Sequence, residues 1–117
     1  EPVIRVGFLD ARRDLTDVRD TVDAYRALMV RGAPGRPYNI CSGRAHQIRD
    51  VLDGLLRQSR VSVDVVVDPT RLRPSDNPLL VGDPGRIRRE IGWQPRISLD
   101  QTLGDLLDYW RAAIRPT

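Results

Sequence analysis

All nineteen basic residues of this 117-residue chain are arginines. An arginine guanidinium is permanently charged and offers paired donors to phosphate or carboxylate oxygens. Small clusters occur at residues 12–13, 71–73 and 86–89. A basic surface of this kind can attract any polyanion, although the even spread of arginines is also what a coding bias produces. No nucleic-acid motif or interleaved aromatic residue accompanies the clusters, so a specific nucleic-acid binder is the weakest of the interpretations.

The remaining reactive side chains exclude several kinds of chemistry. Without a lysine, the chain can form no Schiff base, no P-loop lysine contact and no Tyr-x-x-x-Lys pair. The single histidine, His46, has no Gly-x-Ser-x-Gly turn near it, so no Ser-His-Asp triad is indicated and a surface position near a helix start is expected. The single cysteine, Cys41, can form no internal disulfide and has no partner for a metal site. No general base lies at a recognisable sequence spacing from Cys41 or Ser42, so no catalytic residue is predicted. The side chain of Cys41 is expected to point into the core.

Composition is that of an ordinary globular protein. Hydrophobic residues make up 40% and charged residues 30%, and the formal net charge is +3. The sequence has no apolar run long enough for a membrane span and no signal-peptide pattern, so we expect a soluble, cytoplasmic protein with no membrane partner. Because aromatic residues are few, the core must consist mainly of Val, Ile and Leu, with Trp93 and Trp110 as anchors.

Hydrophobic periodicity and turn residues predict an alternation of strands and helices. The predicted strands are residues 3–6, 38–41 and 61–67, and the predicted helices are residues 17–31, 47–58, 84–91 and a last helix that begins after Ser98. Residues 7–14 and 68–78 are predicted as irregular connections. The expected helix boundaries are caps at Thr16, Asp83 and Ser98 and stops at Gly32 and Gly92.

This order predicts an α/β structure. The two early strands are too short to form a stable sheet alone, and the helix at residues 17–31 has a broad apolar face. We therefore expect part of the chain to pack against something that this sequence does not contain.

Four segments, in this order and spacing, resemble the extended short-chain dehydrogenase/reductase family. They are Val-Gly-Phe-Leu-Asp-Ala-Arg-Arg-Asp-Leu-Thr-Asp-Val-Arg-Asp at residues 6–20, Tyr-Asn-Ile-Cys-Ser-Gly at residues 38–43, Arg-Leu-Arg-Pro-Ser-Asp at residues 71–76, and Gly-Asp at residues 82–83 leading to Gly-Trp-Gln-Pro at residues 92–95. Within that family they look most like GDP-mannose 4,6-dehydratases and GDP-6-deoxy-4-keto-mannose reductases. The Leu-Thr-Asp-Val-Arg-Asp stretch favours the reductase branch.

The resemblance implies that residues 1–117 form the nucleotide-sugar-binding C-terminal portion of such an enzyme. Residues 14–58 would complete a Rossmann sheet, and residues 61–117 would form a small α+β substrate-binding lobe. The family's N-terminal half carries a glycine-rich turn for NAD(P) and a Tyr-x-x-x-Lys pair, and neither motif occurs in this sequence. NAD(P) is therefore expected in the parent enzyme, bound mainly by that half, and no cofactor is expected on this chain alone.

By resemblance, four residues are the candidates for substrate binding. Arg13 and Arg73 match diphosphate ligands. Alternatively, Arg13 and its neighbour Arg12 are surface residues whose charges balance those of Asp10 and Asp14, and Arg73 is a solvated loop residue. Asp76 matches an acidic residue that contacts ribose hydroxyls, or it caps the turn before Pro78. Phe8 replaces the usual asparagine and has no hydrogen-bond donor in its side chain. It would stack on the substrate or fill space, so the identity of the substrate is left undetermined.

The leading hypothesis is thus the part of an NAD(P)-dependent dehydratase or reductase that binds a GDP-sugar, GDP-mannose or GDP-4-keto-6-deoxymannose, and that is inactive by itself. The alternative is a non-enzymatic remnant or split-gene module that folds by associating with a partner. That partner would be a separate Rossmann half or further copies of the chain in a homo-oligomer.

Overall fold

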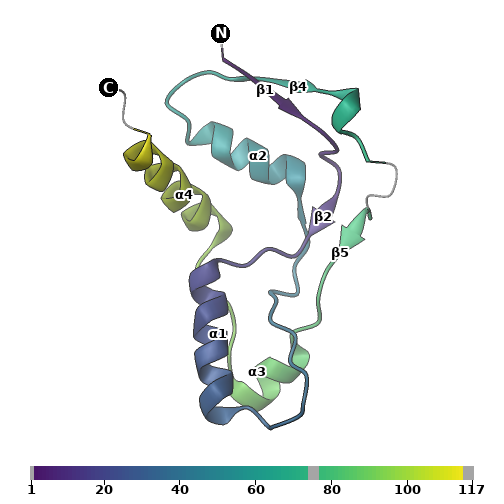
Figure 1. The fold of residues 1–117 in the computed structure, drawn as a ribbon, viewed down its shortest axis with the longest axis vertical. Helices are drawn as coiled ribbons and strands as arrows, with labels where there is room; N and C mark the ends of the chain where they lie inside the picture. Colours follow the sequence, from purple (N-terminus) through teal and green to yellow (C-terminus); the bar gives the residue numbers. More distant parts are fainter. Residues whose placement is uncertain (1, 74–76, 115–117) are drawn as a thin grey trace.

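The computed structural model describes residues 2–73 and 77–114, and its ribbon has an open shape (Figure 1). The helices are α1 (Val18–Arg31), α2 (Ile48–Arg57), α3 (Gly85–Ile91), α4 (Leu99–Ala113) and the short 3-10 helix η1 (Pro69–Arg71). The strands are β1 (Val3–Val6), β2 (Arg12–Arg13), β3 (His46–Gln47), β4 (Asp64–Val67) and β5 (Leu79–Leu80). This alternation confirms the predicted α/β class. No helix in the described ranges combines the length and the apolar character needed to cross a membrane.

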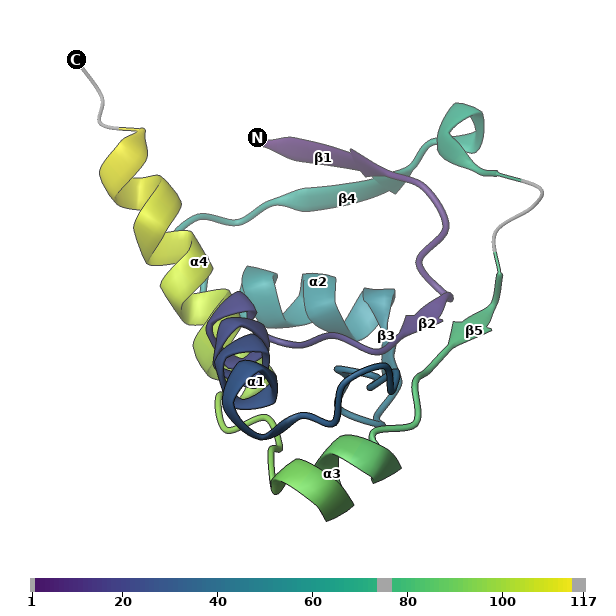
Figure 2. The same ribbon diagram turned by 60° about the horizontal axis from the view of Figure 1, so that its bottom comes forward.

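The strands form two small sheets. β1 and β4 pair in parallel, with Val3 opposite Asp64, and Figures 1 and 2 both show this pair running alongside α2. In the second sheet β2 is central, antiparallel to β3 and parallel to β5. Sheets this narrow are marginal without further support. The helices around them must therefore supply much of the packing.

Asp17 holds the start of α1 against α4. Its carboxylate accepts the Arg19 backbone amide at 2.8 Å and the Thr102 hydroxyl at 2.7 Å, and it pairs with the Arg19 guanidinium. The predicted cap at Thr16 was therefore wrong by one residue, because the Thr16 hydroxyl instead contacts that of Thr21, at 3.1 Å. First the hydrogen bond from Arg19, and then the one from Thr102, hold the pKa of Asp17 well below its ordinary value against the opposing effect of burial.

Asp20 connects α1 to the segment before α4. Its side-chain Oδ2 accepts the backbone amides of Arg96 and Ile97, at 3.2 and 3.0 Å. Its backbone carbonyl accepts the indole N–H of Trp93 at 3.1 Å. Trp93 is 4% exposed and belongs to the buried cluster with Ala24, Ile87 and Ile91, so its predicted role as a core anchor is confirmed.

The other helix boundaries follow local signals. Gly32 and Gly92 end α1 and α3 as predicted, Gly92 with φ at +77°, and Ser98 caps α4 by accepting the Gln101 amide. At α3 the last residue before the helix is Pro84 rather than Asp83, although the Asp83 carboxylate still accepts the Gly85 amide at 2.8 Å.

Three expectations for strands need correction. Residues 38–41 are not a strand, because no described segment pairs with their backbone. The strand predicted at residues 61–67 begins only at Asp64, where pairing with β1 begins. Within residues 7–14, predicted as a connection, Arg12 and Arg13 form β2.

The molecule is flat, and much of its surface is exposed to solvent. Its radius of gyration is 17.4 Å and its shortest dimension 20 Å, whereas a compact domain of this length has a radius of gyration of roughly 13 Å. It exposes 8705 Å², and a folded monomer of this mass exposes roughly 6,500 Å². Trp110 is 52% exposed, so its predicted role as a core anchor was wrong for this chain.

Candidate substrate-binding site

Arg13 lies on β2, the central strand of the three-stranded sheet. Arg13 lies opposite His46 in β3 and opposite Leu80 in β5. Its Nη1 donates to the Arg12 carbonyl oxygen at 2.8 Å, and its side chain is half-buried while Arg12 is exposed. Because both edges of β2 are paired, the backbone from which the Arg13 guanidinium projects is fixed.

The two aspartates that could have neutralised this arginine pair have other partners. The Asp10 carboxylate pairs with Arg49 at 3.0 Å. The Asp14 carboxylate accepts the Ser42 hydroxyl at 2.6 Å and the backbone amides of Ser42, Gly43 and Gly82 at 2.9, 2.9 and 3.2 Å. In the described part of the chain, neither Arg12 nor Arg13 forms a salt bridge.

Asp14 is a polar junction between segments that are distant in sequence. Burial alone would raise its pKa, but the hydroxyl of Ser42 and the three backbone amides together outweigh burial and hold the pKa below its ordinary value. The ionised carboxylate thus ties the end of β2 to the turn at Ser42 and to the residues that follow β5.

Cys41 lies beside this junction and is not set up as a nucleophile. A Cβ added at Gly82 would lie 2.5 Å from the Cys41 sulfur, so the thiol packs directly against that glycine. Burial, and then the nearby Asp14 charge, raise the pKa of the thiol. Cys41 is half-buried, not fully inside the core as expected.

Phe8 and Arg73 lie on two connections that touch each other. A Cβ added at Gly7 would lie 2.6 Å from the Arg71 carbonyl oxygen, so the backbone before Phe8 touches the segment that leads to Arg73. Phe8 is 37% exposed and Arg73 is also exposed. Asp76 lies outside the described residues. The structure therefore brings the segments of Phe8 and Arg73 together, while Arg13 lies further along the chain in β2 (Figure 1).

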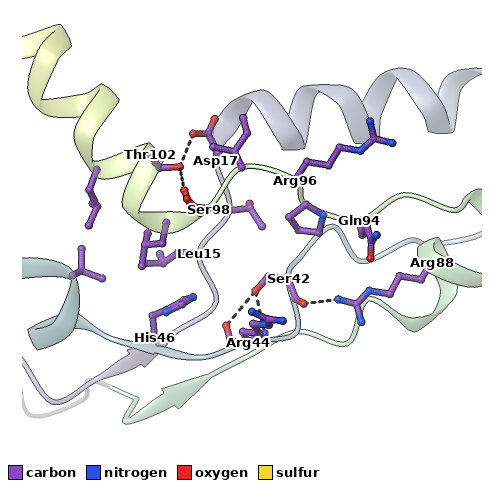
Figure 3. A pocket seen from close by; sticks show the side chains of 16 residues that line it. Leu15, Asp17, Ser42, Arg44, His46, Arg88, Gln94, Arg96, Ser98 and Thr102 are labelled. Atoms are coloured by element: carbon purple, nitrogen blue, oxygen red, sulfur yellow. Dashed lines mark hydrogen bonds between the residues drawn. The ribbon is translucent and has the colours of Figure 1, made fainter. Parts of the chain in front are cut away.

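A cavity of about 470 Å³ lies elsewhere, between the starts of α1 and α4 and the turn after residue 41 (Figure 3). Arg44, His46 and Arg88 contribute to its wall, whereas Phe8, Arg13 and Arg73 do not. The Arg88 guanidinium donates to the Ser42 carbonyl oxygen at 2.8 Å across 46 positions of sequence. Of these wall residues, only Ser42 and His46 were considered as catalytic candidates from the sequence, and no local signal brings Arg88 to this turn.

Arg13, on a strand paired at both edges, carries charge-assisted hydrogen-bond donors of the kind that bind anions. No group of His, Cys, Asp or Glu residues within the described ranges could hold a metal ion. Gly43 has φ at +78° and packs against Pro84: a Cβ added there would lie 3.1 Å from the proline ring.

Comparison with known proteins assigns the family. The sequence model of the GDP-mannose 4,6 dehydratase family matches residues 1–106. The chain belongs to this family, within the extended short-chain dehydrogenase/reductases. The predictions of family and fold class are thereby confirmed.

Individual relatives agree with this assignment. The chain is 34% identical over 112 residues to the GDP-6-deoxy-D-mannose reductase of Pseudomonas aeruginosa, which covers 96% of this chain and 37% of the reductase. It is 24% identical over 136 residues to the GDP-mannose 4,6-dehydratase of Vibrio cholerae, covering 92% of this chain and 36% of that enzyme. The structure of RMD from Pseudomonas aeruginosa complexed with NADPH superimposes with a TM-score of 0.89 and 31% identity, over 96% of this chain and 37% of that one. The chain thus spans little more than a third of the length of these relatives.

Proposed function

We propose that this chain is the nucleotide-sugar-binding portion of an NAD(P)-dependent enzyme that acts on GDP-mannose or on its 4-keto-6-deoxy product. The observation that carries the proposal is Arg13, a half-buried arginine on a strand paired at both edges, whose flanking aspartates are engaged elsewhere. A guanidinium held in this way is ready to bind a diphosphate.

The four ligands act on different parts of the substrate. Arg13 and Arg73 bind the diphosphate, and Asp76 accepts hydrogen bonds from the ribose hydroxyls. Phe8, which can donate no hydrogen bond, contacts the substrate through its ring. Within the intact enzyme, residues 14–58 complete a Rossmann sheet and residues 61–117 form the substrate-binding lobe.

A ketone reductase is favoured over a dehydratase. The chain is 34% identical to the Pseudomonas aeruginosa reductase and 24% identical to the Vibrio cholerae dehydratase. In the intact enzyme, the nicotinamide supplies the hydride, and this portion positions the sugar nucleotide. The chain by itself, without a Tyr-x-x-x-Lys pair, is expected to be inactive. Oxidation of NADPH by the purified chain with a GDP-4-keto-6-deoxy sugar would contradict that expectation.

Calorimetric titration of the chain with GDP, and with UDP and ADP for comparison, tests the proposed site. Selective GDP binding is expected, and Arg13→Gln and Arg73→Gln should each weaken it by about tenfold or more, because each removes charge-assisted hydrogen bonds. Arg12→Gln is the matched control, since it removes the same charge from the exposed neighbour on the same strand. Equal losses in all three variants would indicate a general charge effect and refute the assigned ligands.

The second candidate function is a binding module that is completed by another polypeptide. The exposed apolar face of α1 favours it, because four large side chains of that helix, Val18, Val22, Tyr25 and Met29, are each more than half exposed. Size-exclusion chromatography with light scattering should show self-association or poor stability of the isolated chain. A stable monomer with no tendency to associate would contradict this candidate.

A further inference from the structure

The cavity of about 470 Å³ between the starts of α1 and α4 has no part in the proposed sugar-nucleotide site. Its wall comes from segments that are far apart in the sequence, among them the residues before α1, the turn at residues 42–46, α3, and the segment that leads into α4 (Figure 3). Small-molecule sites in proteins have volumes of about 300–1,000 Å³. The cavity therefore has room for a small organic molecule.

The charged side chains of this wall are mostly cationic. Arg44, Arg88 and Arg96 contribute to it, and Asp17 is the one carboxylate among the lining residues. That carboxylate already has a salt bridge at 2.9 Å and a hydroxyl donor at 2.7 Å, so it does not balance the three arginines. None of the three forms a salt bridge within the part of the chain that the structure describes. The wall thus has an excess of positive charge.

The Arg88 guanidinium is held in position while it keeps donors for another partner. One of its nitrogens donates to the Ser42 carbonyl oxygen at 2.8 Å, and Figure 3 shows this contact beside the cavity. A guanidinium has several N–H donors, and among the described residues the Arg88 side chain makes this one hydrogen bond. Because the group is anchored and still has free donors, it is preorganised to bind a phosphate oxygen.

His46 contributes a further donor to the wall. Its side chain is half-buried, and its backbone is fixed in β3 by pairing with Arg13 of β2. An imidazole can donate a hydrogen bond in either protonation state. Since His46 is the single histidine of the chain, its ring signals in an NMR spectrum also report directly on the cavity.

Apolar side chains form another part of the wall, and each is buried or half-buried: Leu15, Val51, Ile97, Leu99 and Leu103. An apolar group placed against them would release water from this surface, which is favourable. An inorganic anion alone would leave the surface uncovered. The wall therefore matches an anionic group that is attached to an apolar body.

We propose that this cavity is a second ligand-binding site and that it binds a small organic phosphate. The arginines and His46 bind the phosphoryl group, and the apolar side chains contact the body of the ligand. A phosphate is favoured over a carboxylate because a phosphomonoester has nearly two negative charges at neutral pH, which matches a wall with three arginines and one engaged carboxylate. The site uses none of the residues assigned to the sugar nucleotide.

NMR of the His46 ring during titration with phenyl phosphate tests the site, in a sample whose circular dichroism shows folded helices. The ring signals should shift saturably, with a dissociation constant of about 1 mM or lower. Inorganic phosphate lacks the apolar body of this probe, and benzoate lacks its second charge. Each should therefore bind at least about tenfold more weakly than phenyl phosphate.

Variants of the wall make the test specific. Arg88→Gln should weaken the binding of phenyl phosphate at least about tenfold. Arg89→Gln is the matched control, because Arg89 is the exposed neighbour on the same helix and does not line the cavity. Arg88→Gln also loses the contact with the Ser42 turn, so Arg44→Gln is the second test. Among the described residues, Arg44 forms hydrogen bonds through its backbone alone, and Arg44→Gln should weaken binding without disturbing the fold.

Four results would overturn the proposal. They are a His46 signal that does not respond to phenyl phosphate, equal binding of inorganic phosphate or benzoate, equal weakening in Arg88→Gln and Arg89→Gln, and unchanged binding in Arg44→Gln. Weakening in Arg73→Gln would put the probe in the sugar-nucleotide site and would overturn the proposal as well. Calorimetric GDP binding is scored separately through Arg13 and Arg73, so failure of the cavity site and failure of the proposed sugar-nucleotide site give different results.

Discussion

The Asp14 carboxylate accepts the backbone amide of Gly82 at 3.2 Å, although 68 positions separate the two residues. The same carboxylate accepts the Ser42 hydroxyl at 2.6 Å. One ionised side chain thus fixes the relative positions of β2, which carries Arg13, and the strands and turns on either side of it.

Replacing Asp14 by alanine should lower the free energy of unfolding by about 2–4 kcal/mol, because three backbone amides and a hydroxyl lose a charged acceptor. Urea unfolding measures the change. Asp10→Ala is the control: its exposed salt bridge with Arg49 is of a kind that contributes about 0–1 kcal/mol. Similar losses in the two variants would show that Asp14 is not a structural junction.

Stability should fall in acid. The folded-state pKa values of Asp14 and Asp17 are both held below the ordinary carboxyl value, so each residue stabilises the fold above roughly pH 4. That contribution is lost as the pH falls through the folded-state pKa values. Urea midpoints between pH 7 and pH 3 should decline below about pH 4, and Asp17→Asn should flatten the decline. A midpoint independent of pH over this range would refute the assignment.

The two tryptophans should respond differently to a fluorescence quencher. Trp93 is 4% exposed, whereas Trp110 is 52% exposed and contacts Tyr109 edge-to-face, with ring centroids 5.3 Å apart. In Trp110→Phe the remaining emission, from Trp93, should resist acrylamide, and in Trp93→Phe the emission from Trp110 should be quenched readily.

Gly92 should be difficult to replace for a purely conformational reason. Its φ is +77°, and a Cβ added there would meet no atom within 4 Å. Gly92→Ala should therefore cost about 1–2 kcal/mol of unfolding free energy through backbone strain alone. Gly92→Asn should cost less, because asparagine tolerates the left-handed region. Thermal unfolding compares the two, and an equal cost would point to a steric cause.

Local signals predicted the helices well. The serine that begins α4 and the glycine that ends α3 act within a few residues of their own positions, so the sequence alone locates them. The error at the start of α1 is of one residue, since Thr16 and Asp17 are both good caps and the choice depends on Thr102, which lies 85 positions away.

Strands and cavity walls were harder to predict because the segments that pair or touch there are far apart in the sequence. Residues 12–13 become a strand only because β3 and β5 lie on either side. The contact of Arg88 with Ser42 is equally invisible in the sequence. Arg13, Arg73, Asp76 and Phe8 were chosen through family resemblance, so their roles stay predictions until the titrations are done.

The 20 Å thickness of the molecule also determines how it should respond to denaturant. A slab two helix diameters deep leaves most side chains in contact with water before unfolding begins. Unfolding then exposes less new surface than it does in a compact domain, so both the urea m-value and the heat-capacity change should be small for 117 residues. Both quantities should increase when another polypeptide covers the exposed face of α1, so they report its association with the chain.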